Sequence, residues 1–178
     1  MKILIASDIH GSAAFTEMLV ARIEREAPDK TVLLGDILYH GPRNDLPEGY
    51  NPKAVIKMLS PLNIVAVKGN CDGEVDDMVL NFPLSSESAF LIYGKRTVYF
   101  CHGHKTAVAA AEGDIVVSGH THLPECREEN GVYYLNPGSV SIPKEGSHHG
   151  YMVFEDGVFT WRDLISGEEI DEFPPLKV

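Results

Sequence analysis

The stretch Lys2-Ile3-Leu4-Ile5-Ala6-Ser7-Asp8-Ile9-His10-Gly11 decides the fold class. An unbroken apolar run predicts a strand buried on both faces, because a half-exposed strand alternates apolar and polar residues. This strand stops at two polar side chains, Asp8 and His10. Ser12 can then cap a helix that Pro28 ends, so the chain is expected to begin as strand, polar tip and helix.

The same unit recurs further along the chain. Strands are expected over 31–34 and 64–67, with a short helix over 55–59, and the strands again run into polar tips. After Pro83 the pattern changes to short strands separated by turns, which we expect at 89–93, 97–100, 115–118, 126–128, 132–135, 151–154 and 158–163. The sequence therefore predicts an α/β fold with two stacked sheets covered by helices, in a single domain over 1–178.

Composition narrows the functional classes. The chain has 178 residues with 26 acidic against 15 basic side chains, a formal charge of -11, which disfavours extended nucleic acid as a partner. No apolar stretch is long enough to span a membrane, and the early Asp8 argues against a signal peptide, so a cytoplasmic location is expected. The cysteines lack metal-binding CxxC spacing.

Polar side chains gather at five expected strand ends. They are Asp8 and His10, Asp36, Asn70 and Asp72, His102 and His104, and His120 and His122. A single Asp or His at a strand end more often caps a helix or stabilises a turn. Five such strand ends together predict a metal site, and their oxygen and nitrogen ligands suit Mn²⁺, Fe, Ni²⁺ or Zn²⁺. On extended backbone, residues i and i+2 point the same way, so each pair can reach one cavity. There are enough ligands for two ions, with Asp36 as the bridging carboxylate.

The ordered motifs Asp8-x-His10, Gly35-Asp36, Gly69-Asn70-x-Asp72, His102 and Gly119-His120-x-His122 resemble the calcineurin-like metallophosphoesterase superfamily, in its YfcE-like phosphodiesterase branch. The resemblance implies a four-layer α-β-β-α sandwich of two mixed sheets. It implies one metal held by Asp8, His10, Asp36 and His122, and a second held by Asp36, Asn70, His102 and His120. Mn²⁺ is the expected ion, with Ni²⁺, Fe, Zn²⁺ or Mg²⁺ as alternatives, and a homodimer or homotetramer is plausible by resemblance.

The implied reaction is hydrolysis of a small phosphodiester by in-line attack of a metal-bridging hydroxide. Asp36, Asn70, Cys71 and His104 are the residues expected to take part in it. Phosphomonoesterases of the superfamily commonly have His where this chain has Cys71, and a thiol is a poor general acid, so a diester substrate is expected. His104 or a metal-bound water is left as the proton donor.

Further residues near the motifs have weaker signals. His40, Arg43 and Asn44 lie in a loop rich in proline and glycine, where they either contact substrate or face solvent. Asp72 is expected to orient a neighbouring histidine or Cys71, and Asn136 to support the metal site, although either could be a plain turn residue. The alternative functions are a protein-binding scaffold of the same fold and a phosphomonoesterase or nuclease.

Overall fold

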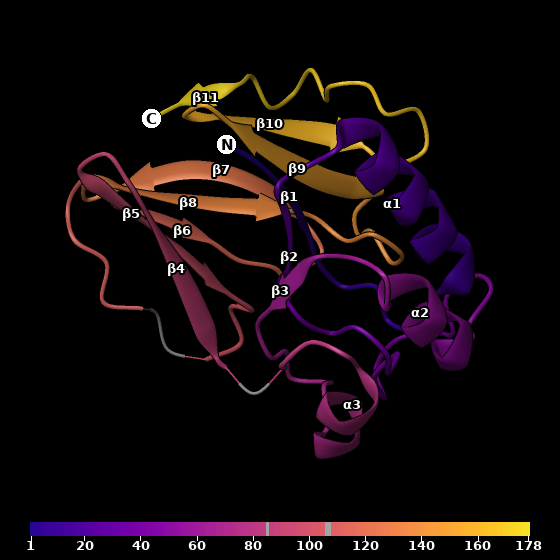
Figure 1. The fold of residues 1–178 in the computed structure, drawn as a ribbon. Helices are drawn as coiled ribbons and strands as arrows, with labels where there is room; N and C mark the ends of the chain where they lie inside the picture. Colours follow the sequence, from indigo (N-terminus) through magenta and orange to yellow (C-terminus); the bar gives the residue numbers. More distant parts are fainter. Residues whose placement is uncertain (85, 106–107) are drawn as a thin grey trace.

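Two mixed β-sheets pack against each other in the computed structural model, which describes residues 1–84, 86–105 and 108–178 (Figure 1). The first sheet has the strand order β11-β10-β9-β1-β2-β3 and the second β4-β5-β6-β8-β7. The strands of the first are β1 (Lys2–Ala6), β2 (Lys30–Leu33), β3 (Ile64–Ala66), β9 (Gly150–Glu155), β10 (Val158–Asp163) and β11 (Leu176–Lys177). Those of the second are β4 (Ser88–Tyr93), β5 (Arg96–Cys101), β6 (Ile115–Val117), β7 (Pro124–Glu129) and β8 (Val132–Pro137).

The apolar run of β1 is buried on both faces, as its sequence predicts. Leu4 and Ala6 belong to the core beneath the helices, whereas Ile3 and Ile5 belong to the core between the two sheets. β1 pairs in parallel with β2, and β2 pairs in parallel with β3. The carboxyl ends of these strands therefore meet at one edge of the sheet, which places their polar tips together.

Two helices cover the outer face of the first sheet. In α1 (Ala13–Glu26), Ser12 Oγ accepts the N–H of Phe15 at 3.2 Å, which is the expected cap. In α2 (Pro52–Leu59), Asn51 caps in the same way, and apolar side chains of both helices lie in the core with Leu4. A further helix, α3 (Glu74–Val79), buries none of its residues and was not predicted from the sequence.

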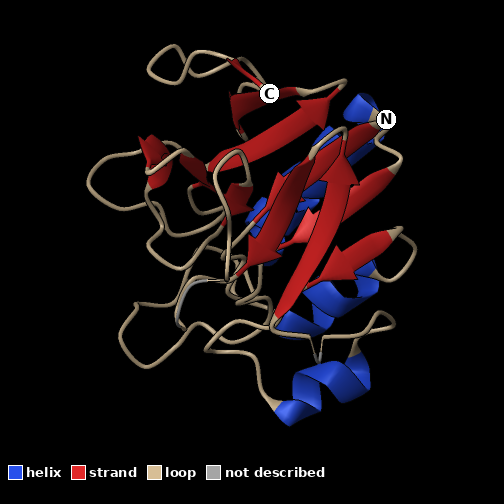
Figure 2. Ribbon diagram, turned by 90° about the vertical axis from the view of Figure 1, so that its left-hand side faces the viewer, coloured by secondary structure: helices blue, strands red, loops and turns tan. Residues whose placement is uncertain are grey.

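The outer face of the second sheet is open in the part of the chain that the structure describes. Viewed toward this sheet, the helices lie behind and below its strands (Figure 2). Phe90 and Ile92 of β4 are accordingly 67% and 69% exposed. The expected α/β sandwich of two mixed sheets is confirmed, with α1 and α2 forming a helical layer on the first sheet. The second helical layer of the expected four-layer α-β-β-α arrangement is not found, because no helix of the described residues covers the outer face of the second sheet. No helix in the described ranges is long and apolar enough to cross a membrane.

The tips of the two sheets are joined by hydrogen bonds. The N–H of His10 donates to Asp36 O at 2.9 Å, which links the loop after β1 to the loop after β2. His102 follows β5 of the second sheet, and its Nδ1 donates to Leu34 O at 2.7 Å in the first. Gly119, in the loop that follows β6, donates its N–H to His102 O. Side chains from both sheets therefore converge at one end of the sandwich.

Candidate metal centre

Left-handed backbone turns hold most of the candidate ligands. The φ angles are 58° at Asp8, 49° at His10, 53° at Asp36, 68° at His120 and 62° at His122. A residue with a Cβ pays about 1 kcal/mol for this conformation, and Asp and His adopt it more readily than most. The extended backbone assumed for the pairs Asp8/His10 and His120/His122 is therefore wrong. These two pairs nevertheless reach one site, because each of their tips turns tightly at both members of the pair.

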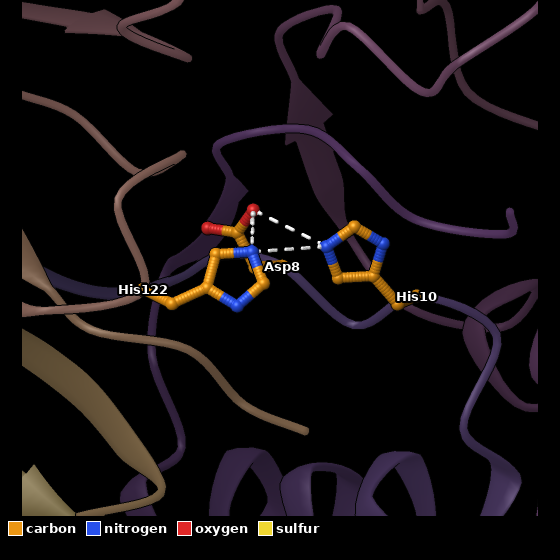
Figure 3. Close-up of side chains that lie close together, drawn as sticks. All are labelled: Asp8, His10 and His122. Carbon is orange, nitrogen blue, oxygen red and sulfur yellow. Dashed lines mark hydrogen bonds and ion pairs between the residues drawn. The ribbon is translucent and has the colours of Figure 1, made fainter. Parts of the chain in front are cut away.

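Three side chains from two distant parts of the chain form the first cluster (Figure 3). Asp8 Oδ1 lies 3.6 Å from His10 Nε2 and 3.4 Å from His122 Nε2, and the two Nε2 atoms are 3.2 Å apart. All three residues are buried. Both imidazoles thus point the same ring nitrogen at one carboxylate oxygen.

The hydrogen bonds of these rings show what the first cluster lacks. His10 Nδ1 lies 2.8 Å from Tyr39 O, and His122 Nδ1 lies 2.6 Å from Ile142 O. Because a carbonyl only accepts, each Nδ1 carries the proton, and each neutral ring presents a lone pair at Nε2. Within the described residues, the buried Asp8 Oδ1 makes no hydrogen bond. Lone pairs and an orphaned carboxylate oxygen that converge in a buried place fit a cation.

Asp36 and His102 form the centre of a second cluster. His102 Nε2 lies 3.4 Å from Asp36 Oδ2 and 3.0 Å from Asn70 Oδ1, while its Nδ1 is bonded to a carbonyl. Asp36 Oδ2 also lies 3.7 Å from His10 Nε2, so Asp36 stands between the two clusters. The His120 ring centroid is 5.1 Å from that of His102. This is the arrangement in which one carboxylate could serve two ions.

Charges in the clusters act on one another strongly. Burial opposes ionisation of Asp8 and Asp36, but the imidazoles beside them outweigh it and hold the pKa of both carboxyls below its usual range. Burial likewise opposes the charged form of His10 and His102, yet the neighbouring carboxylates raise the pKa of both rings. His120 differs, because burial and the positive charge of His102 lower its pKa. The carboxylates thus favour the protonated form of His10 and His102, and a metal ion bound there would compete with those protons.

Asp72 fastens the tips of β2 and β3 together. Its carboxylate accepts the N–H of Asp36 at 2.8 Å, of Ile37 at 2.8 Å and of Gly69 at 2.7 Å. Burial raises the pKa of Asp72, and the three N–H donors oppose that shift. The sequence predicted contact with a histidine or Cys71, whereas the carboxylate fixes the backbone that carries Asp36.

Cys71 and His104 lie on different sides of the clusters. The Cys71 N–H donates to Asp36 Oδ1 at 2.8 Å, and burial together with Asp36 raises the pKa of the Cys71 thiol to about 12. His104 lies beyond His102, with ring centroids 5.3 Å apart, in a separate hollow beside Glu87. Burial and the charge of His102 lower its pKa, and among the described residues its buried Nδ1 has no partner.

A cavity of about 690 Å³ opens over the clusters. Asp36, Asn70, His120 and His122 lie on its floor, and Arg43 and Asn44 are in its wall. Asn136 lies behind that floor, where its Nδ2 donates to Gly119 O at 2.8 Å and supports the loop of His120.

The residues that line the cavity differ in part from those that the sequence predicts. His40 does not line this cavity, because its ring lies between those of Tyr39 and Tyr50, at centroid distances of 4.8 and 5.3 Å. Two wall residues, Tyr39 and Lys144, were not singled out from the sequence. Neither belongs to a motif, and only the fold brings their loops to the cavity.

The model of the calcineurin-like phosphoesterase superfamily domain matches residues 1–156. The chain belongs to the calcineurin-like phosphoesterase superfamily. Within this superfamily, it is 40% identical to phosphodiesterase YfcE of Escherichia coli K12 over 166 residues, which cover 90% of each chain. It is 27% identical to the probable metallophosphoesterase YsnB of Bacillus subtilis over 166 residues, covering 86% of this chain and 83% of that one.

Solved structures place the chain in the same superfamily fold. The structure of the E. coli phosphoesterase YfcE matches with a TM-score of 0.93 and 38% identity, covering 100% of both chains. Zinc-bound Vps29 of Entamoeba histolytica shares the fold at 20% identity, with a TM-score of 0.62 over 100% of this chain and 98% of that one. The expected family, the two-sheet fold and the phosphoesterase class are confirmed, and the clusters give this member candidate ligands for divalent metal.

Proposed function

We propose that the protein hydrolyses small phosphodiesters with two divalent metal ions bound at the strand tips. The observation that carries this proposal is the convergence of Nε2 atoms from His10 and His122 on the unpartnered Asp8 Oδ1. The 40% identity to a protein named phosphodiesterase supports the diester rather than another phosphate ester. In this proposal the whole chain, 1–178, acts as one domain.

The ligand sets follow the clusters and the expected motifs. Asp8, His10, Asp36 and His122 hold one ion, and the second takes Asp36, Asn70, His102 and His120. Divalent ions bound there would lower the pKa of water and offset the charge that develops at phosphorus during an in-line displacement. The resemblance to the superfamily makes Mn²⁺ the proposed ion, and a site of mixed nitrogen and oxygen donors also accepts Ni²⁺, Fe, Zn²⁺ or Mg²⁺.

The side chains of the protein position the parts of this reaction. Carbonyl acceptors fix the tautomers of His10, His102 and His122, so their Nε2 atoms stay available to metal. Cys71 keeps its proton near neutral pH, because the pKa of its thiol is about 12, and is a weak general acid. A small diester with a good leaving group needs the least help from such an acid, which agrees with the proposed substrate.

The decisive experiment compares bis-p-nitrophenyl phosphate with p-nitrophenyl phosphate on metal-stripped protein titrated with Mn²⁺. We expect diester turnover that requires metal, exceeds monoester turnover and is lost in Asp36→Asn. Asp45→Asn is the matched control, because Asp45 is an exposed carboxylate in the loop before α2. Calorimetry should count two Mn²⁺ ions per chain.

A folded protein without turnover under any of these ions would contradict the proposal. It would favour the scaffold alternative.

A further inference from the structure

The wall of the cavity has a charge opposite to that of the whole protein. The chain has a formal charge of -11, yet the exposed charged side chains in the cavity wall are the cations Arg43 and Lys144. The carboxylates that line the cavity, Asp36 and Asp72, are buried. Asp36 lies among the candidate ligands, and Asp72 is held by backbone N–H groups. An arriving anion therefore meets positive groups at the mouth.

Both cations stand on loops that are tied to a candidate metal ligand. His10 Nδ1 donates to Tyr39 O at 2.8 Å, and Asn44 Nδ2 closes the following turn on His40 O at 2.8 Å. Arg43 lies within this turn.

The loop of Lys144 is fixed in the same manner. His122 Nδ1 donates to Ile142 O at 2.6 Å, and the N–H and Oγ of Ser147 bond to Lys144 O at 2.9 and 2.7 Å. Each cation is thus carried by a loop hydrogen-bonded to one of the two histidines of the first cluster.

The phosphodiester itself accounts for only one negative charge. In the proposed function that charge is met by the metal ions, so the two cations remain for a second anionic group. Guanidinium and ammonium groups are the side chains that bind phosphate and carboxylate most directly. The cavity volume of about 690 Å³ leaves room for a substituent larger than a single phosphate.

We propose, on the basis of the proposed phosphodiesterase function, that the site selects diesters carrying a second anionic group, which Arg43 and Lys144 bind. Lys144 and Arg43 are therefore specificity residues of the cavity wall. They act on binding of the substituent, not on the bond that breaks.

A pair of substrates with the same leaving group tests this proposal. Thymidine 5′-(p-nitrophenyl phosphate) has one negative charge, and its 3′-phosphate derivative adds the second anionic group. We expect the wild-type protein to prefer the derivative in kcat/KM by about threefold or more, the scale of one exposed charge pair, chiefly through KM. Lys144→Gln and Arg43→Gln should each reduce this preference, and the double variant should abolish it.

The control is Lys95→Gln, which removes one charge from the exposed β4–β5 turn and should keep the full preference. Calorimetry gives a readout that does not depend on turnover: Mn²⁺-loaded protein should bind thymidine 3′,5′-bisphosphate more tightly than thymidine 5′-phosphate, and the double variant should not. Equal kcat/KM for both substrates in a protein that hydrolyses them would overturn this inference and leave the proposed function intact. Loss of all diester turnover would overturn the proposed function, and calorimetry would then decide the inference.

Discussion

Asp72 holds Asp36 through the main chain, by accepting its N–H at 2.8 Å rather than by touching its side chain. The same carboxylate accepts the N–H of Gly69 on the neighbouring strand tip, so Asp72 joins the tips of β2 and β3 at this edge, together with the bond from Cys71 N–H to Asp36 Oδ1. Asp72 therefore positions Asp36, the candidate bridging ligand, although its carboxylate bonds only to backbone N–H groups among the hydrogen bonds described above.

Asp72→Asn should weaken both the fold and metal binding. An amide retains one acceptor oxygen but turns an NH₂ group toward a backbone donor, and a buried donor left without a partner costs about 1–3 kcal/mol. Urea unfolding of metal-free protein measures the first effect. Mn²⁺ titration measures the second, for which we expect a loss of about tenfold or more. Stability and affinity equal to those of Asp45→Asn would contradict the role of Asp72.

Gly69→Ala should displace the carboxylate of Asp36. A Cβ at Gly69 would lie 2.1 Å from Asp36 Oδ1 and 2.5 Å from Asp36 N, and so steric relief requires the tip to move. We expect a loss of about 1–3 kcal/mol in unfolding free energy, together with weaker Mn²⁺ binding. Gly73→Ala is the control, since its Cβ would meet nothing closer than 4.0 Å. Identical Mn²⁺ affinities for the two variants would show that the contact does not matter.

Cys71→His should move activity toward monoesters. An imidazole titrates near neutral pH, whereas the thiol that it replaces has a pKa of about 12, so the variant gains a usable general acid. We expect kcat/KM for p-nitrophenyl phosphate to rise about tenfold or more relative to that for bis-p-nitrophenyl phosphate. Cys71→Ala, which removes the thiol without adding an acid, should leave monoester turnover low. A substrate ratio unchanged by the histidine would remove this account of Cys71.

The metal-free protein should be most stable in a window between the carboxylate and histidine titrations. The pKa values of His10 and His102 are raised above 6.5, so their contribution is complete below pH 6.5 and is lost as pH rises through the raised values. Those of Asp8 and Asp36 are lowered below 3.8, so their contribution is present above pH 3.8 and is lost on acidification. Urea unfolding across pH measures this window, and His102→Gln should flatten its alkaline side.

Mn²⁺ binding should become stronger over the alkaline pH range in which the metal-free protein loses stability. The ion requires the neutral form of each ring, so its affinity should increase as pH rises through the raised histidine pKa values, with release of protons. Calorimetry in two buffers of different ionisation enthalpy counts these protons. His148→Gln, at an exposed histidine outside the clusters, should release the same number as wild type. An affinity independent of pH would place metal away from these rings.

The sequence predicts the part of the fold that rests on strong local patterns. The apolar run of β1, the Ser12 cap and the Gly94-Lys95 hairpin all have the structure that their residues indicate. α3 escaped prediction because it buries no residue and so shows no apolar face.

The sequence likewise predicts one part of the candidate site and not another. Residue types and spacing identify which side chains meet, because parallel strands deliver their ends to one edge. They do not reveal the left-handed φ angles of Asp8 and His10, because the extended strand pattern gives no sign of where the backbone turns. Nor do they reveal Lys144, whose loop between β8 and β9 reaches the cavity only through tertiary packing.

The bonds from His10 and His122 to Tyr39 O and Ile142 O end on main-chain carbonyls, which every amino acid possesses. The orientation of each imidazole therefore does not depend on the side chain at position 39 or 142, provided that the backbone of each loop keeps its path. Substitutions can accumulate in the cavity wall while His10 and His122 keep their orientation. Because the wall and the candidate ligands vary independently, the substrate range can change without loss of the ligands. A library randomised at positions 39, 43 and 144 would test new substrates on an unchanged set of candidate metal ligands.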